Sequence, residues 1–154
     1  MKKSTISKLP LLTLFIGLFF IAPSFAQKSK GEKNKFIEGK NYDVQFYELK
    51  ATGRGKAIKS LVFIKGGKIE GDLMYEKLGM DPIAYRVTLD STFTEDDAES
   101  RIVSIEAKSS KDKSDFEWEA TITNFDIEGT VTQSKNGVQK KKYEFSGSVK
   151  IKKK

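Results

Sequence analysis

Apolar and polar residues alternate one by one along most of the chain after Lys40, which is the pattern of strands that bury one face. The runs span residues 42–46, 58–64, 69–75, 85–89, 103–107, 116–122, 127–131 and 143–151. The alternation therefore predicts about eight strands. It also assigns Leu61, Phe63, Tyr75 and Leu89 to the buried face.

Short turns join these runs, among them Gly66-Gly67 and Asn136-Gly137, and Asn-Gly is the strongest short signal for a hairpin. Only residues 74–83 could form a helical turn, which Pro82 would end. We predict an all-β fold, a single antiparallel meander of about eight strands closed into an up-and-down barrel. A two-sheet β-sandwich is the alternative, and the short connections favour the barrel.

Three of the runs have glycine at their centre, as IEGDL, IEGTV and FSGSV. Counting the alternation places Gly71, Gly129 and Gly147 on the same face as the apolar residues. Glycine on the buried face of a strand lets the strand bend sharply or lets a neighbour lie close to the backbone. We interpret the repeated glycines as positions that allow the barrel to close.

The first 26 residues have the features of a secretory signal peptide. A basic start that extends to Lys8 precedes an apolar stretch, which is too short to span a bilayer, and small residues lead to cleavage near Ala26/Gln27. No cysteine follows the apolar stretch, so a lipoprotein anchor is excluded. The expected location is the periplasm or the extracellular medium.

The rest of the chain is long enough for one domain with a core. We predict a signal peptide at 1–26, a flexible polar N-terminal segment at 27–39, a barrel domain at 40–151 and a basic tail at 152–154. The sequence has no cysteine, so packing rather than disulfides must stabilise the domain.

The net charge of +7 is concentrated at the two ends of the chain. Residues 27–40 contain five lysines and residues 140–154 contain seven, whereas acidic residues outnumber basic ones between them. Such ends predict at most a weak contact with an anionic lipid or polyanion. They lack interleaved aromatic residues, so no nucleic-acid partner is expected, and we expect a monomer.

The composition excludes much of catalytic chemistry, because the chain contains neither histidine nor cysteine. Histidine-based triads, thiol nucleophiles and the usual zinc, haem and iron–sulfur ligands are absent. Glu117 and Glu119 share one strand face, and their alternation with apolar residues puts them in solvent. The acidic loop at 95–99 lacks calcium-loop spacing and is interpreted as a hairpin tip. We predict no catalytic residue, no metal site, no cofactor and no enzymatic activity.

An eight-stranded barrel is just wide enough either to be filled by side chains or to hold one small ligand. The aromatic residues expected inside define a candidate site for a small apolar or amphipathic molecule, in which tyrosine hydroxyls supply hydrogen bonds. This candidate site comprises Tyr42, Phe46, Tyr75, Tyr85, Trp118 and Tyr143. The alternative is a filled core in a non-enzymatic envelope or interaction protein.

The pattern resembles the calycin superfamily, which comprises the lipocalin, fatty-acid-binding and avidin-like barrels. It also resembles small exported proteins of Bacteroidetes-like bacteria in its C-terminal motif. That motif consists of Trp118, Ile127, Gly129, Gly137, Tyr143, Phe145 and Gly147. The resemblance implies a ligand-binding barrel. The lipocalin G-x-W and the tryptophan set of avidin are missing, so it implies no ligand identity and no functional residue.

Overall fold

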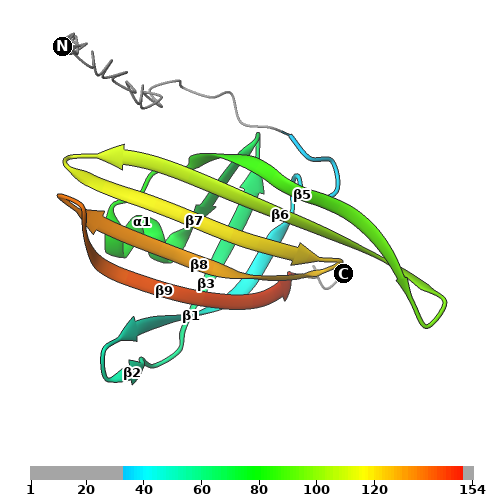
Figure 1. Cartoon of the computed structure of the whole chain (residues 1–154), viewed down its shortest axis with the longest axis horizontal. Coiled ribbons are helices and arrows are strands. Elements are labelled where there is room, and N and C mark those ends of the chain that lie inside the picture. The colour runs from blue at the N-terminus through cyan, green and yellow to red at the C-terminus, as the bar shows by residue number, and fades with distance from the viewer. Residues whose placement is uncertain (1–32, 151–154) are drawn as a thin grey trace, which may run out of the picture.

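The computed structural model describes residues 33–150, so the predicted signal peptide and the basic tail lie outside the described residues. Nine strands and one short helix make up this part of the chain (Figure 1). The elements are β1 (Asn41–Lys50), β2 (Gly53–Arg54), β3 (Ile58–Lys65), β4 (Lys68–Gly71), α1 (Asp72–Leu78), β5 (Ile83–Glu95), β6 (Ala98–Lys111), β7 (Ser114–Thr123), β8 (Asp126–Lys135) and β9 (Val138–Val149). No helix of residues 33–150 is long and apolar enough to cross a bilayer.

Eight of the strands form a closed ring of antiparallel neighbours, and the predicted all-β meander is confirmed. The order β1-β3-β4-β5-β6-β7-β8-β9 follows the chain, and β9 pairs back onto β1. The two-residue strand β2 lies outside the ring and pairs only with the end of β1. The architecture is barrel-like and compatible with a calycin-like fold.

Two of the predicted closure glycines allow neighbouring strands to approach more closely than any side chain would permit. A Cβ atom at Gly129 would clash with the main-chain oxygen of Glu119 on β7. A Cβ atom at Gly147 would clash with the main chain of Asp43 and Val44 on β1, where the ring closes. The structural interpretation of these glycines is therefore confirmed.

Helix α1 overturns the strand expected over residues 69–75. Strand β4 ends at Gly71, and the chain turns into α1, in whose first turn the Leu73 N–H donates to Ser60 Oγ at 3.0 Å. Gly79 ends the helix in the left-handed conformation (φ 63°). The helix buries Leu73 and Met74 and leaves Tyr75 64% exposed. Tyr75 is therefore not an interior residue.

The face of β3 is opposite to the one expected. Val62 and Ile64 are buried, while Leu61 and Phe63 lie on the other face and are half-buried. The run Leu-Val-Phe-Ile is apolar at every position, so alternation alone could not fix which residues point inward. Pairing with β1 and β4 decides it.

Leu89 is exposed, not buried, because β5 contains an irregularity at Thr88. Val87 pairs with Ile105 and Leu89 with Ser104, so Thr88 is an extra residue without a partner on β6. A bulge of one residue reverses the faces of all residues that follow it. Asp90 consequently takes the inner face, opposite buried Val103, and Leu89 and Phe93 take the outer face.

The N-terminal segment predicted to be polar and flexible is described from residue 33 onward. Residues 35–39 form a turn in which Ile37 is fully buried, and its carbonyl accepts from Lys40 N–H. The Gly39 N–H donates to the carbonyl of Ile64 at 2.7 Å. The hydrophobic core therefore begins before the predicted domain boundary at residue 40.

Candidate functional site

Five of the six aromatic residues predicted for the barrel interior lie there, and Tyr75 does not. Each of the five is less than 5% exposed. They come from strands β1, β5, β7 and β9, and they are Tyr42, Phe46, Tyr85, Trp118 and Tyr143. The structure thus brings together the set that the alternation predicted, apart from the residue that α1 carries outward.

Phe46 is the centre of an aromatic cluster that fills the interior. Its ring lies 5.0 Å from that of Phe145, and it meets Trp118 and Tyr143 edge-on at 6.4 and 6.5 Å. Edge-on contacts at these distances are favourable for aromatic pairs. The interior at this level is a packed core.

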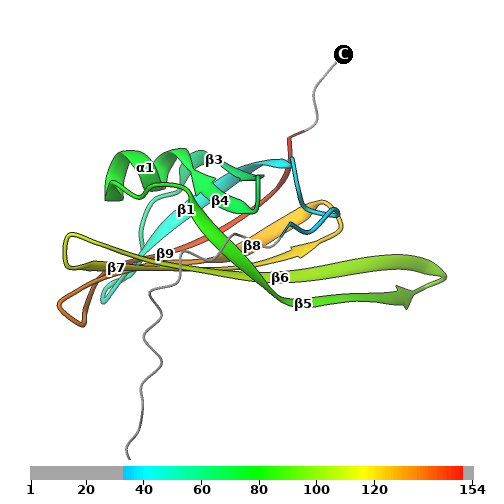
Figure 2. The same cartoon turned by 90° about the horizontal axis from the view of Figure 1, so that it is seen from above.

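Both ends of the barrel are covered. At the end where the β6–β7 and β8–β9 turns lie, α1 covers the interior with Met74 (Figure 2). Trp118 lies next to the start of α1, because its ring is 3.1 Å from the position that a Cβ of Gly71, the residue before the helix, would take. At the opposite end the turn that contains Ile37 is packed on the core.

Among residues 33–150, two buried side-chain polar atoms of this core have no hydrogen-bond partner. They are the hydroxyl oxygen of Tyr42 and the indole Nε1 of Trp118. Burial, followed by the proximity of Tyr85, raises the pKa of the Tyr42 hydroxyl. An unsatisfied buried donor costs about 1–3 kcal/mol, so a molecule that offered an acceptor to either atom would gain that energy.

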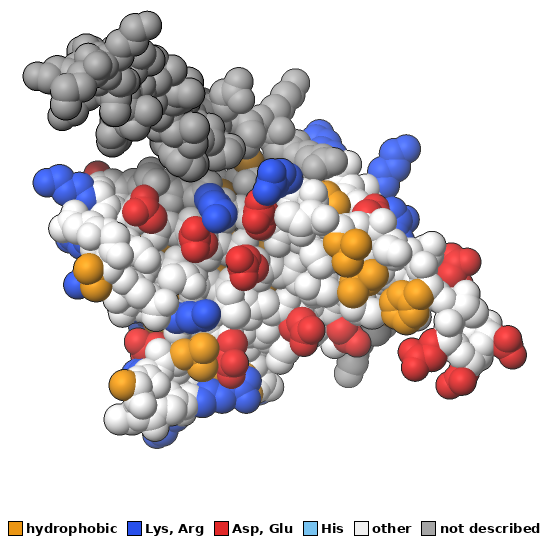
Figure 3. Space-filling model, in the orientation of Figure 1, with side chains coloured by type: hydrophobic (Ala, Val, Ile, Leu, Met, Phe, Trp, Pro, Cys, Tyr) orange, Lys and Arg blue, Asp and Glu red, His pale blue; other side chains and the backbone are white. Residues whose placement is uncertain are grey.

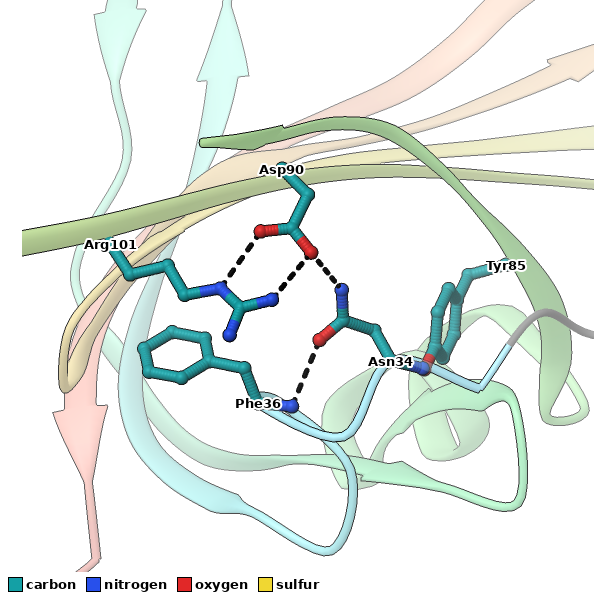
Figure 4. Close-up of polar contacts among 5 residues, drawn as sticks. All are labelled: Asn34, Phe36, Tyr85, Asp90 and Arg101. Carbon is teal, nitrogen blue, oxygen red and sulfur yellow. Dashed lines mark hydrogen bonds and ion pairs between the residues drawn. The ribbon is translucent and has the colours of Figure 1, made fainter. Parts of the chain in front are cut away.

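A polar cluster fixes the N-terminal turn to the β5–β6 hairpin (Figure 4). Asp90 accepts from Arg101 Nε and Nη2 at 2.8 and 2.7 Å, and from Asn34 Nδ2 at 2.7 Å. The hydrogen bond from Arg101, more than that from Asn34, lowers the pKa of Asp90. The Arg101 guanidinium also lies 5.0 Å from the ring centre of Phe36. Sequence reasoning missed this cluster, because its members lie in three separate segments.

The outer face of strands β6–β9 is polar and carries a row of carboxylates, visible in red across the front of Figure 3. A shallow groove of about 530 Å³ runs over it. Its walls include Glu106, Glu119, Glu128 and Glu144, with serine and threonine hydroxyls between them. Glu106 is paired with Arg86 and Glu144 with Arg54. The predicted solvent position of Glu117 is also observed, and this carboxylate accepts from Lys108 at 3.0 Å.

The distal part of the β5–β6 hairpin, residues 88–100, extends beyond the barrel (Figures 1 and 2). We call it the projecting hairpin. Its outer face exposes Leu89 (45%) and Phe93 (40%), and several hydrophobic side chains, in orange, reach the surface on this side of the molecule in Figure 3. Its tip turns through Asp96 and Asp97, which have positive φ angles, and carries the acidic side chains expected there.

One edge of this hairpin has no strand beside it in the part of the chain that the structure describes. Strand β4 pairs with β5 only at Ile83 and Ala84, and beyond them the Tyr85 N–H donates to the carbonyl of Gly67 at 3.2 Å. The β6–β7 ladder begins at Ile102, so the hairpin is a two-stranded ribbon from there to its tip. Among residues 33–150 no group of three or more acidic side chains is placed to hold a metal ion.

Comparison with protein-family models, with curated proteins and with solved structures finds no match to this chain. The assignment of a function therefore depends on the site itself. Two features stand out from the barrel: the two unpartnered polar atoms of the core, and the unpaired edge of the projecting hairpin.

Proposed function

We propose that this protein is a non-enzymatic binding module that takes an extended segment of a partner protein along the edge of β5. The observation that carries the proposal is the edge of β5 from Thr88 to Glu95, which has no strand beside it among residues 33–150 and which includes the exposed side chains of Leu89 and Phe93. The N–H and C=O groups that alternate residues direct to such an edge form a template for another strand.

The sequence of this edge does not protect it from pairing. Proteins usually block an exposed edge with proline, with lysine or with a bulge. Residues 89–95, LDSTFTE, contain neither proline nor lysine, and the irregularity at Thr88 precedes them. Asp90 is directed to the inner face, where Arg101 neutralises it. The edge is therefore open to strand addition.

The surroundings of the edge define the chemistry of the partner segment. Leu89 and Phe93 lie on one face, so alternate residues of the added strand must be apolar. The tip carries Glu95, Asp96, Asp97 and Glu99, so a basic residue is required at the end that faces the tip. In an antiparallel arrangement that end is the N-terminus of the segment.

A synthetic peptide tests the proposal directly. The probe is a soluble ten-residue peptide that starts with arginine and then alternates valine with threonine, and its control has the same composition in scrambled order. Fluorescence anisotropy is expected to show binding of the ordered peptide. Phe93→Ser weakens binding by roughly tenfold, since burying a phenylalanine contributes about 1.5–3 kcal/mol. Phe125→Ser, at an exposed phenylalanine away from the edge, leaves it unchanged. Equal binding of both peptides contradicts the proposal.

A second candidate function is binding of a small amphipathic molecule inside the barrel, and the unpartnered Tyr42 hydroxyl and Trp118 Nε1 favour it. The interior is packed, so entry requires α1 to move away with Met74. The test follows the fluorescence of Trp118, the single tryptophan, during titration with dodecanoate. Dodecyltrimethylammonium has the same tail and no acceptor, and it is the matched control. An unchanged spectrum with both contradicts this candidate.

We also propose that the protein is exported, on the sequence of residues 1–26. We propose that it is a calycin, on the strand pattern. The lysines near both ends are the ground for a weak contact with anionic surfaces. Mass spectrometry of the protein from the native host tests the first of these. A mature start at Gln27 is expected, and retention of residues 1–26 would contradict it.

A further inference from the structure

We infer that the partner segment is the same edge of β5 in a second copy of this chain, so that two projecting hairpins join into one four-stranded antiparallel sheet. The inference rests on the strand-adding edge proposed above and names its occupant. The segment of a second copy has the required chemistry. Its apolar residues alternate with polar ones, and Arg86 precedes them at the N-terminal end.

The match between the two copies is best in one register, with Ser91 on the twofold axis. Leu89 of each copy then lies opposite Phe93 of the other on the outer face. Both side chains are exposed in the isolated chain, and Ile102 is half-buried between them on the neighbouring strand. The two Leu89–Phe93 pairs lie on either side of the Ser91 pair at the axis, and each pair removes apolar surface from water that one copy alone leaves exposed.

Charge selects the antiparallel arrangement. The acidic tips, with Glu95, Asp96 and Asp97, lie at opposite ends of the antiparallel pair, whereas a parallel pair would place them side by side. Each tip instead approaches Arg86 of the other copy, whose side chain is 70% exposed. On the inner face Asp90 lies opposite Thr92, so no two like charges face each other across the axis.

Pairing with a second copy also stabilises the projecting hairpin. A two-stranded ribbon is marginally stable in water, and three or more strands with an apolar face are needed for independent stability. From Thr88 to the tip this hairpin has two strands and no described cover on its outer face. Joining two copies converts each ribbon into half of a four-stranded sheet and covers the free edge of β5 in both copies.

Sedimentation equilibrium of the purified protein tests the inference. The wild type is expected to be a concentration-dependent dimer. Ser91→Lys places two positive charges against each other at the axis, and Ser91→Asp places two negative charges there, so each variant alone dimerises at least tenfold more weakly. An equimolar mixture of the two variants restores association, because lysine then faces aspartate. Ser146→Lys, the same change at an exposed serine on the outer face of β9, leaves the dimer unchanged.

The outcomes separate the inference from the proposed function. A monomer at all concentrations, or open-ended oligomers, overturns the inference. A dimer that Ser91→Lys does not weaken, or a mixture that does not recover, overturns it as well. If the wild type is monomeric and the arginine-led peptide still binds, the strand-adding function stands and only its occupant is wrong. If neither the peptide nor a second copy binds, the proposed function and the inference are both wrong.

Discussion

Asp90 and Arg101 are joined by two hydrogen bonds, of 2.8 and 2.7 Å, at the point where the projecting hairpin leaves the barrel. The pair bridges β5 and β6, and through Asn34 it also holds the N-terminal turn against them. This ion pair therefore holds the N-terminal turn against the part of β5 where the free edge begins.

This pair gives the N-terminal turn a pH dependence. The hydrogen bond from Arg101 lowers the pKa of Asp90 below its ordinary value of 3.8. A carboxyl group whose pKa is lowered on folding stabilises the fold above its unfolded pKa, and the contribution is lost as the pH falls through the lowered value. The amide protons of Ile37 and Gly39 should therefore exchange faster below about pH 3.8. The comparison is with amide protons that exchange only through global unfolding of the domain.

Asp90→Asn is the matched variant for that experiment. It keeps the shape of the side chain and removes the titrating group, so this part of the pH dependence should disappear while exchange near neutral pH becomes faster. Asp115→Asn, at an exposed carboxyl group on β7, should keep the acceleration. An identical pH profile for Asp90→Asn and the wild type would show that the pair does not hold the turn.

The closure glycines should be intolerant of the smallest side chain. Gly147→Ala places a methyl group against the main chain of Asp43 and Val44, and such overpacking costs about 1–3 kcal/mol. Urea denaturation should show the loss in the free energy of unfolding. Ser146→Ala, one residue away and exposed, should change it by less than about 0.5 kcal/mol. Equal stability of the two variants would mean that β9 and β1 close the ring differently.

Removing the unpartnered hydroxyl of the core should not weaken the fold. Tyr42→Phe deletes a buried donor that has no acceptor, so the free energy of unfolding should stay equal or rise by about 1 kcal/mol. Phe46→Leu, in the same core, should lower it by about 1 kcal/mol or more through lost packing. A loss of stability in Tyr42→Phe would reveal an acceptor inside the barrel and would support the interior ligand.

The turn before β1 should count as part of the folded domain. Ile37→Ala removes a fully buried side chain and should cost about 2–4 kcal/mol. Lys35→Ala, on the exposed side of the same turn, should have little effect on thermal unfolding. If Ile37→Ala melted like the wild type, the domain would begin at Lys40, as its alternation indicates.

The sequence predicted the meander because each strand of the last third alternates strictly, and the paired residues of β7, β8 and β9 all face as counted. Trp118, Ile127 and Phe145 are buried, and Glu119 is not. Alternation predicted the wrong face where a run had no polar residue or where a strand contained an extra residue. Leu61 lies in a run without polar residues, and Leu89 follows an extra residue that no local sequence signal marks.

The remaining features depend on contacts between distant segments. Residues 73–75 continue the strand pattern of Ile69 and Gly71, and the helix that they form depends on a contact with another strand, the hydrogen bond from the Leu73 N–H to Ser60 Oγ. In the polar cluster of Asn34, Asp90 and Arg101, the hydrogen bond from Asn34 to Asp90 joins residues 56 positions apart. The free edge of β5 is likewise a property of the topology, since it exists because β4 is short.

The pairing of β1 with β9 sets the order in which this domain can be completed. Lys150 N–H donates to the carbonyl of Asn41 at 2.8 Å, so the first and last strands of the ring meet at their ends. Contacts of such large sequence separation slow folding. The ring cannot close while the chain is still being synthesised short of β9, and the apolar faces of the earlier strands stay without their final partner until then.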